Sequence, residues 1–258
     1  MTQPAREAAP FEGVLVGMPT YNEADNAPRL VRSLREHLPG AVVMVIDDAS
    51  PDGTAGLIRH LAEQDEHVVV HSRPGKLGLG TAYLVAFAEA RRRGCRATLT
   101  LDADFSHRPQ DAPAIVRAVL GGAADLAIGS RYVPGGAIVG WPRTRRVLSA
   151  EANRLIKASL ATEVMDCTGS FRAYGAALVE RLPTTLRNRG YSALPELLLH
   201  AILSRARIAE VPITFVERER GATKLTRREI ADSLMNLAWL SRRRRQSPIE
   251  PGGGVTAG

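Results

Sequence analysis

Apolar stretches that each end in a cluster of polar residues recur through the first half of the chain. The stretches have the length and composition of buried β-strands, and amphipathic helical segments separate them. Strands are expected at 14–18, 41–46, 68–70, 97–101 and 126–128. Strands that alternate with helices are typical of parallel βαβ units with helices on both faces of the sheet. The pattern therefore predicts an α/β fold with a doubly wound, mostly parallel sheet.

The polar clusters that follow four of these strands predict one shared site. They are Tyr21 with Glu23, Asp47 with Asp48, Asp102 with Asp104, and Arg131. In an open parallel sheet, ligands bind at the carboxyl ends of the strands. One such cluster could be a simple capping turn, whereas four at equivalent strand ends indicate a common binding site.

Asp102 and Asp104 are the candidate metal ligands. At strand spacing, residues i and i+2 lie on the same face, so the two carboxylates would repel each other unless a cation lay between them. Oxygen ligands suit Mg²⁺ or Mn²⁺, and such an ion can also hold a substrate diphosphate. The alternative is a solvated turn that caps the following helix, and the motif alone leaves both interpretations open.

Two further features near these acids are ambiguous. The loop 75–80 carries Lys76 and three glycines, but it lacks the ending of a Walker loop and the third glycine of a dinucleotide fingerprint. This argues against a kinase or a dehydrogenase and leaves a phosphate loop or a plain connector. His107 stands beside a proline turn, where either a structural role or metal ligation fits.

The overall charge restricts the class of partner. The 258 residues carry a formal charge of +7, with arginines clustered at 91–93, 143–146 and 242–245. Such a balance suits nucleic acid, an anionic membrane or a phosphorylated substrate. Aromatic residues make up 5% of the chain and do not alternate with the basic runs, which argues against nucleic acid. Two isolated cysteines, Cys95 and Cys167, indicate a reducing compartment and packing roles.

The alternation of strands and helices ends after Tyr132. A loop is expected at 135–142, a turn at 166–172, helices at 145–160 and 193–203, and a strand at 208–216 interrupted by Pro212. We divide the chain into a loose tail (1–11), one domain (12–226), a basic amphipathic helix (227–245) and a disordered tail (246–258). The arginines that end the helix suit either a solvated helix end or an anionic membrane surface. No apolar run approaches the ~20 residues of a membrane span, and the N-terminus lacks the pattern of a signal peptide.

Six motifs, in order between residues 13 and 226, resemble those of polyprenol-phosphate (dolichyl-phosphate) mannosyltransferases. They are Pro19-Thr20-Tyr21-Asn22-Glu23, the stretch Asp47–Thr54, Lys76-x-Gly78-Leu79-Gly80, Asp102-Ala103-Asp104, Gly129-Ser130-Arg131-Tyr132 and Arg218-x-x-Gly221-x-Thr223-Lys224-Leu225. The stretch Asp166–Arg172 is similar to the version in actinobacterial members. The resemblance implies an inverting family-two glycosyltransferase of GT-A (Rossmann-like) fold, with acceptor-side helices near the C-terminus.

The resemblance also implies roles for individual residues. Asp102 and Asp104 would bind Mg²⁺ or Mn²⁺ on the diphosphate, with Ser106 as a third residue on the metal side. Many relatives have glutamine at that position, so the shorter serine would act through water. Arg131 and Arg145 would meet the lipid phosphate, and Asp104 and Arg131 would be the catalytic pair. The nucleotide sugar would contact Pro19, Tyr21, Glu23, Ile46, Asp48, Asp102, Ala103, Arg218 and Lys224.

The implied reaction transfers mannose from GDP-mannose to a polyprenyl phosphate with inversion. A phosphate monoester has a second pKa of ~6 and is already a nucleophile, so Asp104 would bind metal rather than move a proton. The alternatives are a UDP-sugar such as UDP-glucose as donor, or a non-catalytic protein that binds a membrane surface. The expected location is cytoplasmic and peripheral, at the inner face of the cell membrane, alone or with a membrane-protein partner.

Overall fold

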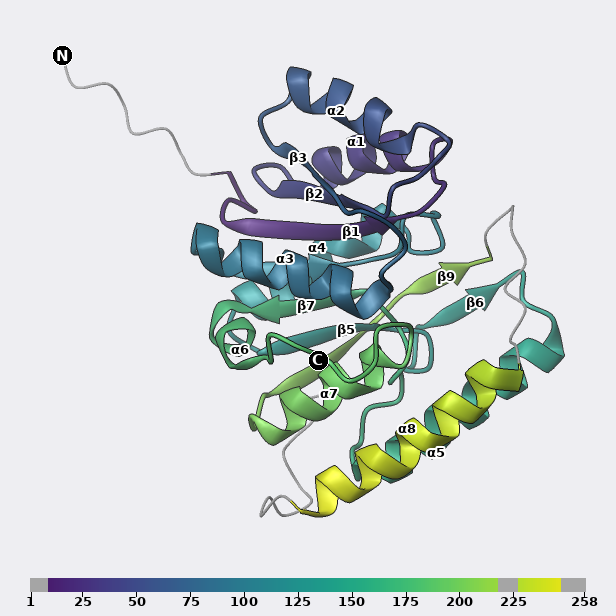
Figure 1. Ribbon diagram of the computed structural model, residues 1–258. Helices are drawn as coiled ribbons and strands as arrows, with labels where there is room; N and C mark the ends of the chain where they lie inside the picture. Colours follow the sequence, from purple (N-terminus) through teal and green to yellow (C-terminus); the bar gives the residue numbers. More distant parts are fainter. Residues whose placement is uncertain (1–8, 218–226, 247–258) are drawn as a thin grey trace.

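The computed structural model describes residues 9–217 and 227–246, and Figure 1 shows a central sheet with helices on both faces. The seven-stranded sheet has the order β3-β2-β1-β4-β7-β5-β8. Its strands are β1 (Val14–Thr20), β2 (Val42–Asp47), β3 (Val68–Ser72), β4 (Ala97–Thr100), β5 (Leu126–Ser130), β7 (Arg172–Gly175) and β8 (Ile208–Pro212). All neighbouring pairs run parallel except those that involve β7. The predicted α/β fold with a mostly parallel sheet is confirmed.

The helices form two layers that bury both faces of the sheet. They are α1 (Ala27–His37), α2 (Thr54–Gln64), α3 (Leu79–Arg93), α4 (Ala112–Leu120), α5 (Arg143–Leu160), α6 (Ala176–Arg181), α7 (Ala193–Leu203) and α8 (Arg227–Arg245), with a 3₁₀ turn at Pro109–Asp111. One core contains residues of α1, α2 and α4, and the other contains residues of α3, α6 and α7. Along β1, Val14 and Val16 face the first core and Leu15 faces the second, which explains its unbroken apolar sequence.

The antiparallel strand β7 was not expected, because its first residue was placed at the end of a turn at 166–172 and no element was predicted for residues 173–175. β7 lies between β4 and β5 and pairs antiparallel with both. Its first residue, Arg172, is fully buried and donates hydrogen bonds to the carbonyls of Gly169, Leu194 and Cys167. A four-residue strand that begins with arginine carries no alternating signal, so the sequence pattern indicated a turn.

A second, two-stranded sheet also differs from the expectation. β6 (Ala137–Val139) lies in the stretch predicted as a loop and pairs in parallel with β9 (Thr214–Val216). The strand expected at 208–216 is divided at Pro212, where β8 ends and the chain passes to the small sheet. β9 carries Phe215, and Trp141 follows β6 by two residues; both side chains line a cavity beyond β4.

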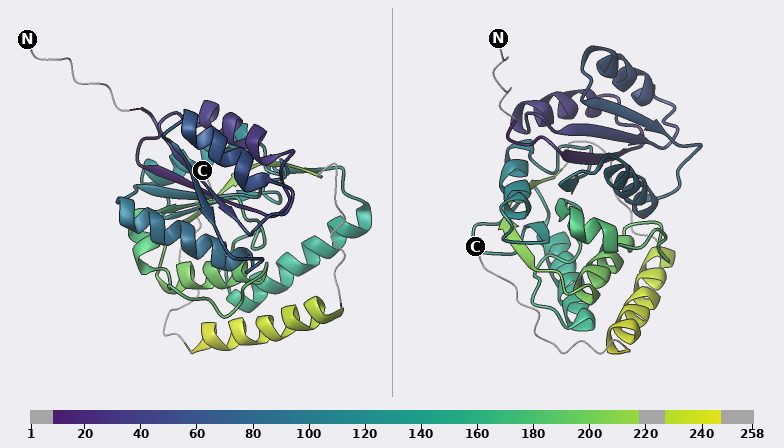
Figure 2. Two further views of the ribbon diagram at one scale, coloured as in Figure 1. Left: turned by 45° about the horizontal axis from the view of Figure 1, so that its top comes forward. Right: turned by 90° about the vertical axis from the view of Figure 1, so that its left-hand side faces the viewer.

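The ends of the domain are packed more fully than the sequence indicated. Phe11, placed in the loose tail by the sequence, is buried at 2% exposure, so the packed domain begins before residue 12. α8 runs along α5 on the outside of the domain (Figures 1 and 2). Leu240 of α8 is buried, and Arg244 donates a hydrogen bond to the Leu160 carbonyl. Among the residues described, no helix has both the length and the apolar character needed to cross a bilayer.

Candidate active site

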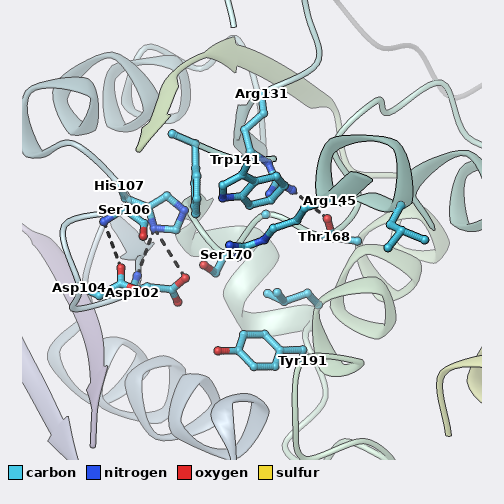
Figure 3. Close-up of a pocket in the computed structure, with 14 residues that line it drawn as sticks. Asp102, Asp104, Ser106, His107, Arg131, Trp141, Arg145, Thr168, Ser170 and Tyr191 are labelled. Atoms are coloured by element: carbon cyan, nitrogen blue, oxygen red, sulfur yellow. Dashed lines mark hydrogen bonds and ion pairs between the residues drawn. The ribbon is translucent and has the colours of Figure 1, made fainter. Parts of the chain in front are cut away.

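A cavity of about 450 Å³ opens beyond the carboxyl end of β4 (Figure 3). Five of the residues predicted for the site line it, namely Asp102, Asp104, Ser106, Arg131 and Arg145. Unpredicted lining residues include Trp141, Phe215 and Tyr191. Residues from the segments after β4 and β5, from α5 and from β9 therefore converge on one space. Of the four polar clusters predicted to share a site, two line this cavity, Asp102 with Asp104 and Arg131, whereas the clusters after β1 and β2 are not part of its lining.

The two aspartates lie in the turn after β4 rather than on the strand itself, which ends at Thr100. The turn is tight: Phe105 has a φ of 59°, and the Asp104 carboxylate accepts a hydrogen bond of 3.0 Å from the Ser106 backbone N–H. Both carboxylates still face the same cavity, so the prediction that they share a site holds although strand spacing is not the cause.

His107 supports this turn from behind. Its Nδ1 accepts a hydrogen bond of 3.2 Å from the Asp102 backbone N–H, so the neutral ring carries its proton on Nε2. The ring packs against Phe171 and Phe215, with centroids 5.0 and 5.4 Å away. Burial lowers the pKa of His107, although the negative charge of Asp102 opposes the shift. These contacts favour the structural interpretation of His107 over a ligand role.

The electrostatics of the aspartates suit a divalent cation. Burial raises the pKa of Asp102, and the charge of Asp104 adds to this effect. A cation between the carboxylates would reverse it, because opposite charge favours the ionised form. Within residues 9–217 and 227–246, no group of three or more His, Cys, Asp and Glu side chains could enclose a metal. Mg²⁺ is typically bound by one or two carboxylates, with phosphate and water oxygens in its remaining coordination positions. Asp102 and Asp104 fit that pattern for Mg²⁺ or Mn²⁺.

Arg131 is held by the carboxylate of Asp166, a residue of the motif 166–172 that was given no role from the sequence alone. Its Nε and Nη2 each lie 2.7 Å from an Asp166 oxygen, and Nη2 also donates to the Thr168 hydroxyl. The side chains of Arg131 and Asp166 are 7% and 0% exposed. Burial alone would raise the pKa of Asp166, but its hydrogen bonds and charge interaction with Arg131 lower it. Most of the Arg131 guanidinium is thus engaged in the buried ion pair with Asp166. Arg131 therefore contributes a positive charge of fixed position to the cavity.

Arg145, in the first turn of α5, is more accessible. Its side chain is 41% exposed and stacks on Trp141, with the guanidinium carbon 4.1 Å from the ring centroid. Among the described residues, Arg145 donates one hydrogen bond, 2.6 Å from Nη1 to the Glu217 carboxylate. Figure 3 shows its guanidinium extending into the cavity toward Ser170. Of the two arginines predicted to meet the lipid phosphate, Arg145 is therefore the more exposed, at 41% against 7% for Arg131.

On the predicted nucleotide side, Asp48 forms a buried ion pair. Its carboxylate pairs with Arg73, and the side chains of the pair are 9% and 4% exposed. Arg73 also donates to the Thr81 hydroxyl at 2.7 Å and to the Gly78 carbonyl at 3.4 Å, while the Asp48 carboxylate accepts from the Leu77 backbone N–H at 3.3 Å. The Asp48–Arg73 pair thus fixes the loop 75–80 and the start of α3.

The other predicted nucleotide contacts occupy different environments. Tyr21 is 40% exposed, and the Lys76 ammonium lies 4.5 Å from its ring centroid. Glu23 accepts a hydrogen bond from the Asn26 side chain, and Pro19 is half-buried at the end of β1. Ile46 and Ala103 are buried. Since the Ile46 side chain belongs to the core, a contact with a nucleoside would come from its backbone. Arg218 and Lys224 lie outside the described residues.

Gly78 is a position where the loop 75–80 tolerates no side chain. Its φ is +99°, and an added Cβ would lie 2.4 Å from the Arg189 carbonyl oxygen. We expect Gly78→Ala to destabilise the protein by about 1–3 kcal/mol in urea denaturation, because it combines an unfavourable φ with a backbone clash. Gly75→Ala is the matched control in the same loop, since nothing lies within 4 Å of its added Cβ and no positive φ is required. Equal stability of the two variants would contradict this account.

Several residues of the site carried weak signals in the sequence. Asp166 and Arg172 stood in a motif that was distinctive only through its resemblance, and Arg73 is one of many arginines. Trp141 appeared only as a loop marker. Each of these side chains acts through a contact distant in sequence, as when Asp166 pairs with Arg131 35 positions away. Local spacing holds no information about such contacts.

Comparison with known proteins identifies the family. The fold is similar to that of solved glycosyltransferase structures. A structure of glucosyl-3-phosphoglycerate synthase from Mycobacterium tuberculosis, with Mn²⁺, UDP and glucosyl-3-phosphoglycerate, matches with a TM-score of 0.65 at 19% identity, over 97% of this chain and 88% of that chain. The mannosyltransferase PcManGT from Pyrobaculum calidifontis, with GDP-Man and Mn²⁺, matches with a TM-score of 0.60 at 21% identity, over 91% and 65% of the chains.

Sequence relatives make the assignment narrower. Residues 15–182 match glycosyl transferase family 2, and the chain belongs to that family. The polyprenol monophosphomannose synthase of Mycolicibacterium smegmatis is 40% identical over 89% of this chain and 87% of its own. The undecaprenyl-phosphate mannosyltransferase of Micrococcus luteus is 37% identical over 87% of this chain and 92% of its own. The resemblance to polyprenol-phosphate mannosyltransferases and its actinobacterial character are confirmed.

Proposed function

We propose that this protein transfers mannose from GDP-mannose to a polyprenyl phosphate with inversion, giving a β-mannosyl phosphoryl polyprenol. The observation that carries the proposal is the cavity beyond β4, in which two aspartates face the accessible Arg145. The aspartates suit a metal on the donor diphosphate, and Arg145 suits the acceptor phosphate. Relatives at 40% and 37% identity, named for transfer of mannose to polyprenyl phosphates, support the same substrates.

The chemistry requires charge stabilisation rather than proton transfer. An oxygen of the acceptor phosphate attacks the anomeric carbon, and the bond from that carbon to the donor diphosphate breaks, so that GDP leaves with its electron pair. Because the phosphate monoester is anionic at neutral pH, no base has to remove a proton. A bound Mg²⁺ or Mn²⁺ would neutralise charge on the leaving diphosphate. Asp102 and Asp104 would hold that ion, Arg145 would orient the acceptor, and Arg131 adds fixed positive charge.

The deciding experiment measures transfer of labelled mannose from GDP-mannose to a polyprenyl phosphate with Mg²⁺, with Mn²⁺ and with a chelator. Formation of a mannosyl lipid that the chelator abolishes supports donor, acceptor and cation together. Transfer only from UDP-glucose would keep the site and replace the donor. Absence of transfer from every donor, in the presence of membranes, would favour a non-catalytic surface protein.

We further propose a peripheral location at the cytoplasmic face of the membrane, where the lipid acceptor lies. α5 supports this proposal, because Val147, Leu148 and Leu155 are 61%, 66% and 52% exposed among the arginines of the same helix. An exposed apolar stripe with basic neighbours suits an anionic lipid surface. Leu148 also lines the cavity, so the stripe leads from the surface toward Arg145.

We expect Leu155→Glu to weaken binding to vesicles of anionic phospholipid about tenfold, because it removes apolar area and adds charge of the same sign as the lipid. Cosedimentation measures the effect. Leu57→Glu is the matched control, since Leu57 is similarly exposed, at 47%, on α2 at the opposite end of the sheet. If both variants bind like the wild type, α5 does not face the membrane. Deletion of residues 227–258 tests the contribution of the basic C-terminal helix in the same assay.

A further inference from the structure

Two arginines that line the cavity, Arg131 and Arg145, are each paired with a carboxylate, and the two pairs differ in their exposure. The Arg131–Asp166 pair is bidentate and buried, with side chains 7% and 0% exposed. The Arg145–Glu217 pair is exposed, at 41% and 34%, and joins one guanidinium nitrogen to one carboxylate oxygen at 2.6 Å. A buried pair is costly to open, whereas an exposed single contact is worth little and opens readily.

The position of Glu217 is built into the fold. Its backbone N–H donates to the Val139 carbonyl at 2.9 Å, which continues the pairing of β9 with β6. Gly140, with a φ of +87°, gives the room for this approach, because an added Cβ would lie 2.9 Å from the Glu217 Cβ. Trp141 follows directly and stacks on Arg145. The small sheet thus brings a carboxylate to the guanidinium that is best placed for the acceptor.

We propose that Glu217 is a removable counter-ion of Arg145 that weakens the hold of the cavity on phosphate groups. This inference rests on the proposed function, in which Arg145 receives the acceptor phosphate. An arriving phosphate must either displace the Glu217 carboxylate from Arg145 or bind beside it against repulsion. Both cases lower the affinity for an anion at this position.

The consequence concerns release of the product as much as capture of the acceptor. The acceptor is a phosphate monoester and the product a phosphodiester, and both place a phosphate at Arg145. If Glu217 occupies Arg145 for part of the time, the apparent dissociation constants of both ligands rise by the same factor, the inverse of the free fraction. Glu217 therefore lowers the affinity for the acceptor and speeds release of the product. The affinity for the donor is unaffected.

The variant Glu217→Gln tests this inference because it removes the charge and keeps the shape. We expect the KM for polyprenyl phosphate and the inhibition constant of the mannosyl lipid product to fall together by about two- to fivefold, the range for an exposed ion pair. The KM for GDP-mannose should not change. A rise in the acceptor KM would overturn the proposal, because it would make Glu217 a residue that orients Arg145 for binding.

Two controls separate this inference from general effects. Glu151→Gln removes the same charge from α5, where Glu151 pairs with Arg154 at 3.8 Å on the surface, and it should leave the acceptor KM unchanged. In an Arg145→Gln background, Glu217→Gln should have no further effect on the acceptor KM, because Glu217 acts on the acceptor only through its interaction with Arg145. Additive effects of the two substitutions would contradict the proposal.

Equilibrium binding keeps the inference testable if no transfer is observed. Calorimetric titration with geranyl phosphate, a short soluble prenyl phosphate, should give tighter binding to Glu217→Gln than to the wild type by the same two- to fivefold. Tighter binding without transfer would support Glu217 as a counter-ion while the proposed reaction fails. Unchanged binding in an active enzyme would overturn the role of Glu217 and leave the reaction intact.

Discussion

Asp104→Asn is expected to lower kcat/KM for mannosyl transfer by a factor of about 10² to 10³, the range for losing one group that stabilises charge in the transition state. The asparagine oxygen can still accept the Ser106 N–H, so the turn after β4 should keep its shape. The substitution removes a negative charge that would face the bound metal and the leaving diphosphate. The measurement is transfer at saturating polyprenyl phosphate with Mn²⁺ varied.

Binding of Mn²⁺ followed by electron paramagnetic resonance gives the second readout for Asp104→Asn. Affinity should fall with the activity, while the free energy of unfolding without metal stays the same or rises, because removing one of two adjacent carboxylates relieves repulsion. Glu63→Gln is the control, since Glu63 is 74% exposed on the surface of α2 and pairs with nearby His60. Wild-type transfer in an Asp104→Ala variant would exclude Asp104 from the site.

The sequence predicted this part of the molecule because the relevant information is local. β4 and β5 are buried runs along their whole length, and the polar residue that follows such a strand must emerge at the carboxyl edge of the sheet. The sequence pattern alone therefore places Asp102, Asp104 and Arg131 together, and the cavity confirms that placement. The same reasoning predicted α7 at Ala193–Leu203, where both ends of the helix agree.

The parts that the sequence did not predict depend on contacts between distant segments. β7 begins with an arginine that is buried because three backbone carbonyls surround its guanidinium. Asp48 was expected to meet a nucleoside, and the structure adds Arg73 as its ion-pair partner. Glu217 had no local signal, because its relation to Arg145 arises from the pairing of β6 with β9. These residues are polar groups whose partners are fixed by topology, and a single sequence does not encode topology in its local pattern.

Asp166→Asn is expected to reduce the free energy of unfolding by about 3–5 kcal/mol, the range for breaking a buried ion pair on one side. The Arg131 guanidinium would remain buried without its counter-charge. The Asp166 carboxylate also accepts the backbone N–H groups of Arg131 and Gly169, and an amide cannot serve all these donors. Urea denaturation at pH 7 measures the change. Glu163→Gln, which breaks the exposed Lys157 pair, should change stability by less than about 1 kcal/mol.

The pH dependence of this difference follows from the lowered pKa of Asp166. A carboxyl group with a folded-state pKa below its usual value of 3.8 binds protons more readily in the unfolded chain. Its stabilisation is complete above pH 3.8 and is lost as the pH falls through the lower folded-state pKa. The gap between the wild type and Asp166→Asn should therefore be constant from pH 7 to about pH 5 and narrow below pH 4. A gap that widens with acidification would mean that Asp166 is not held ionised by Arg131, and that the buried charge at the cavity has another source.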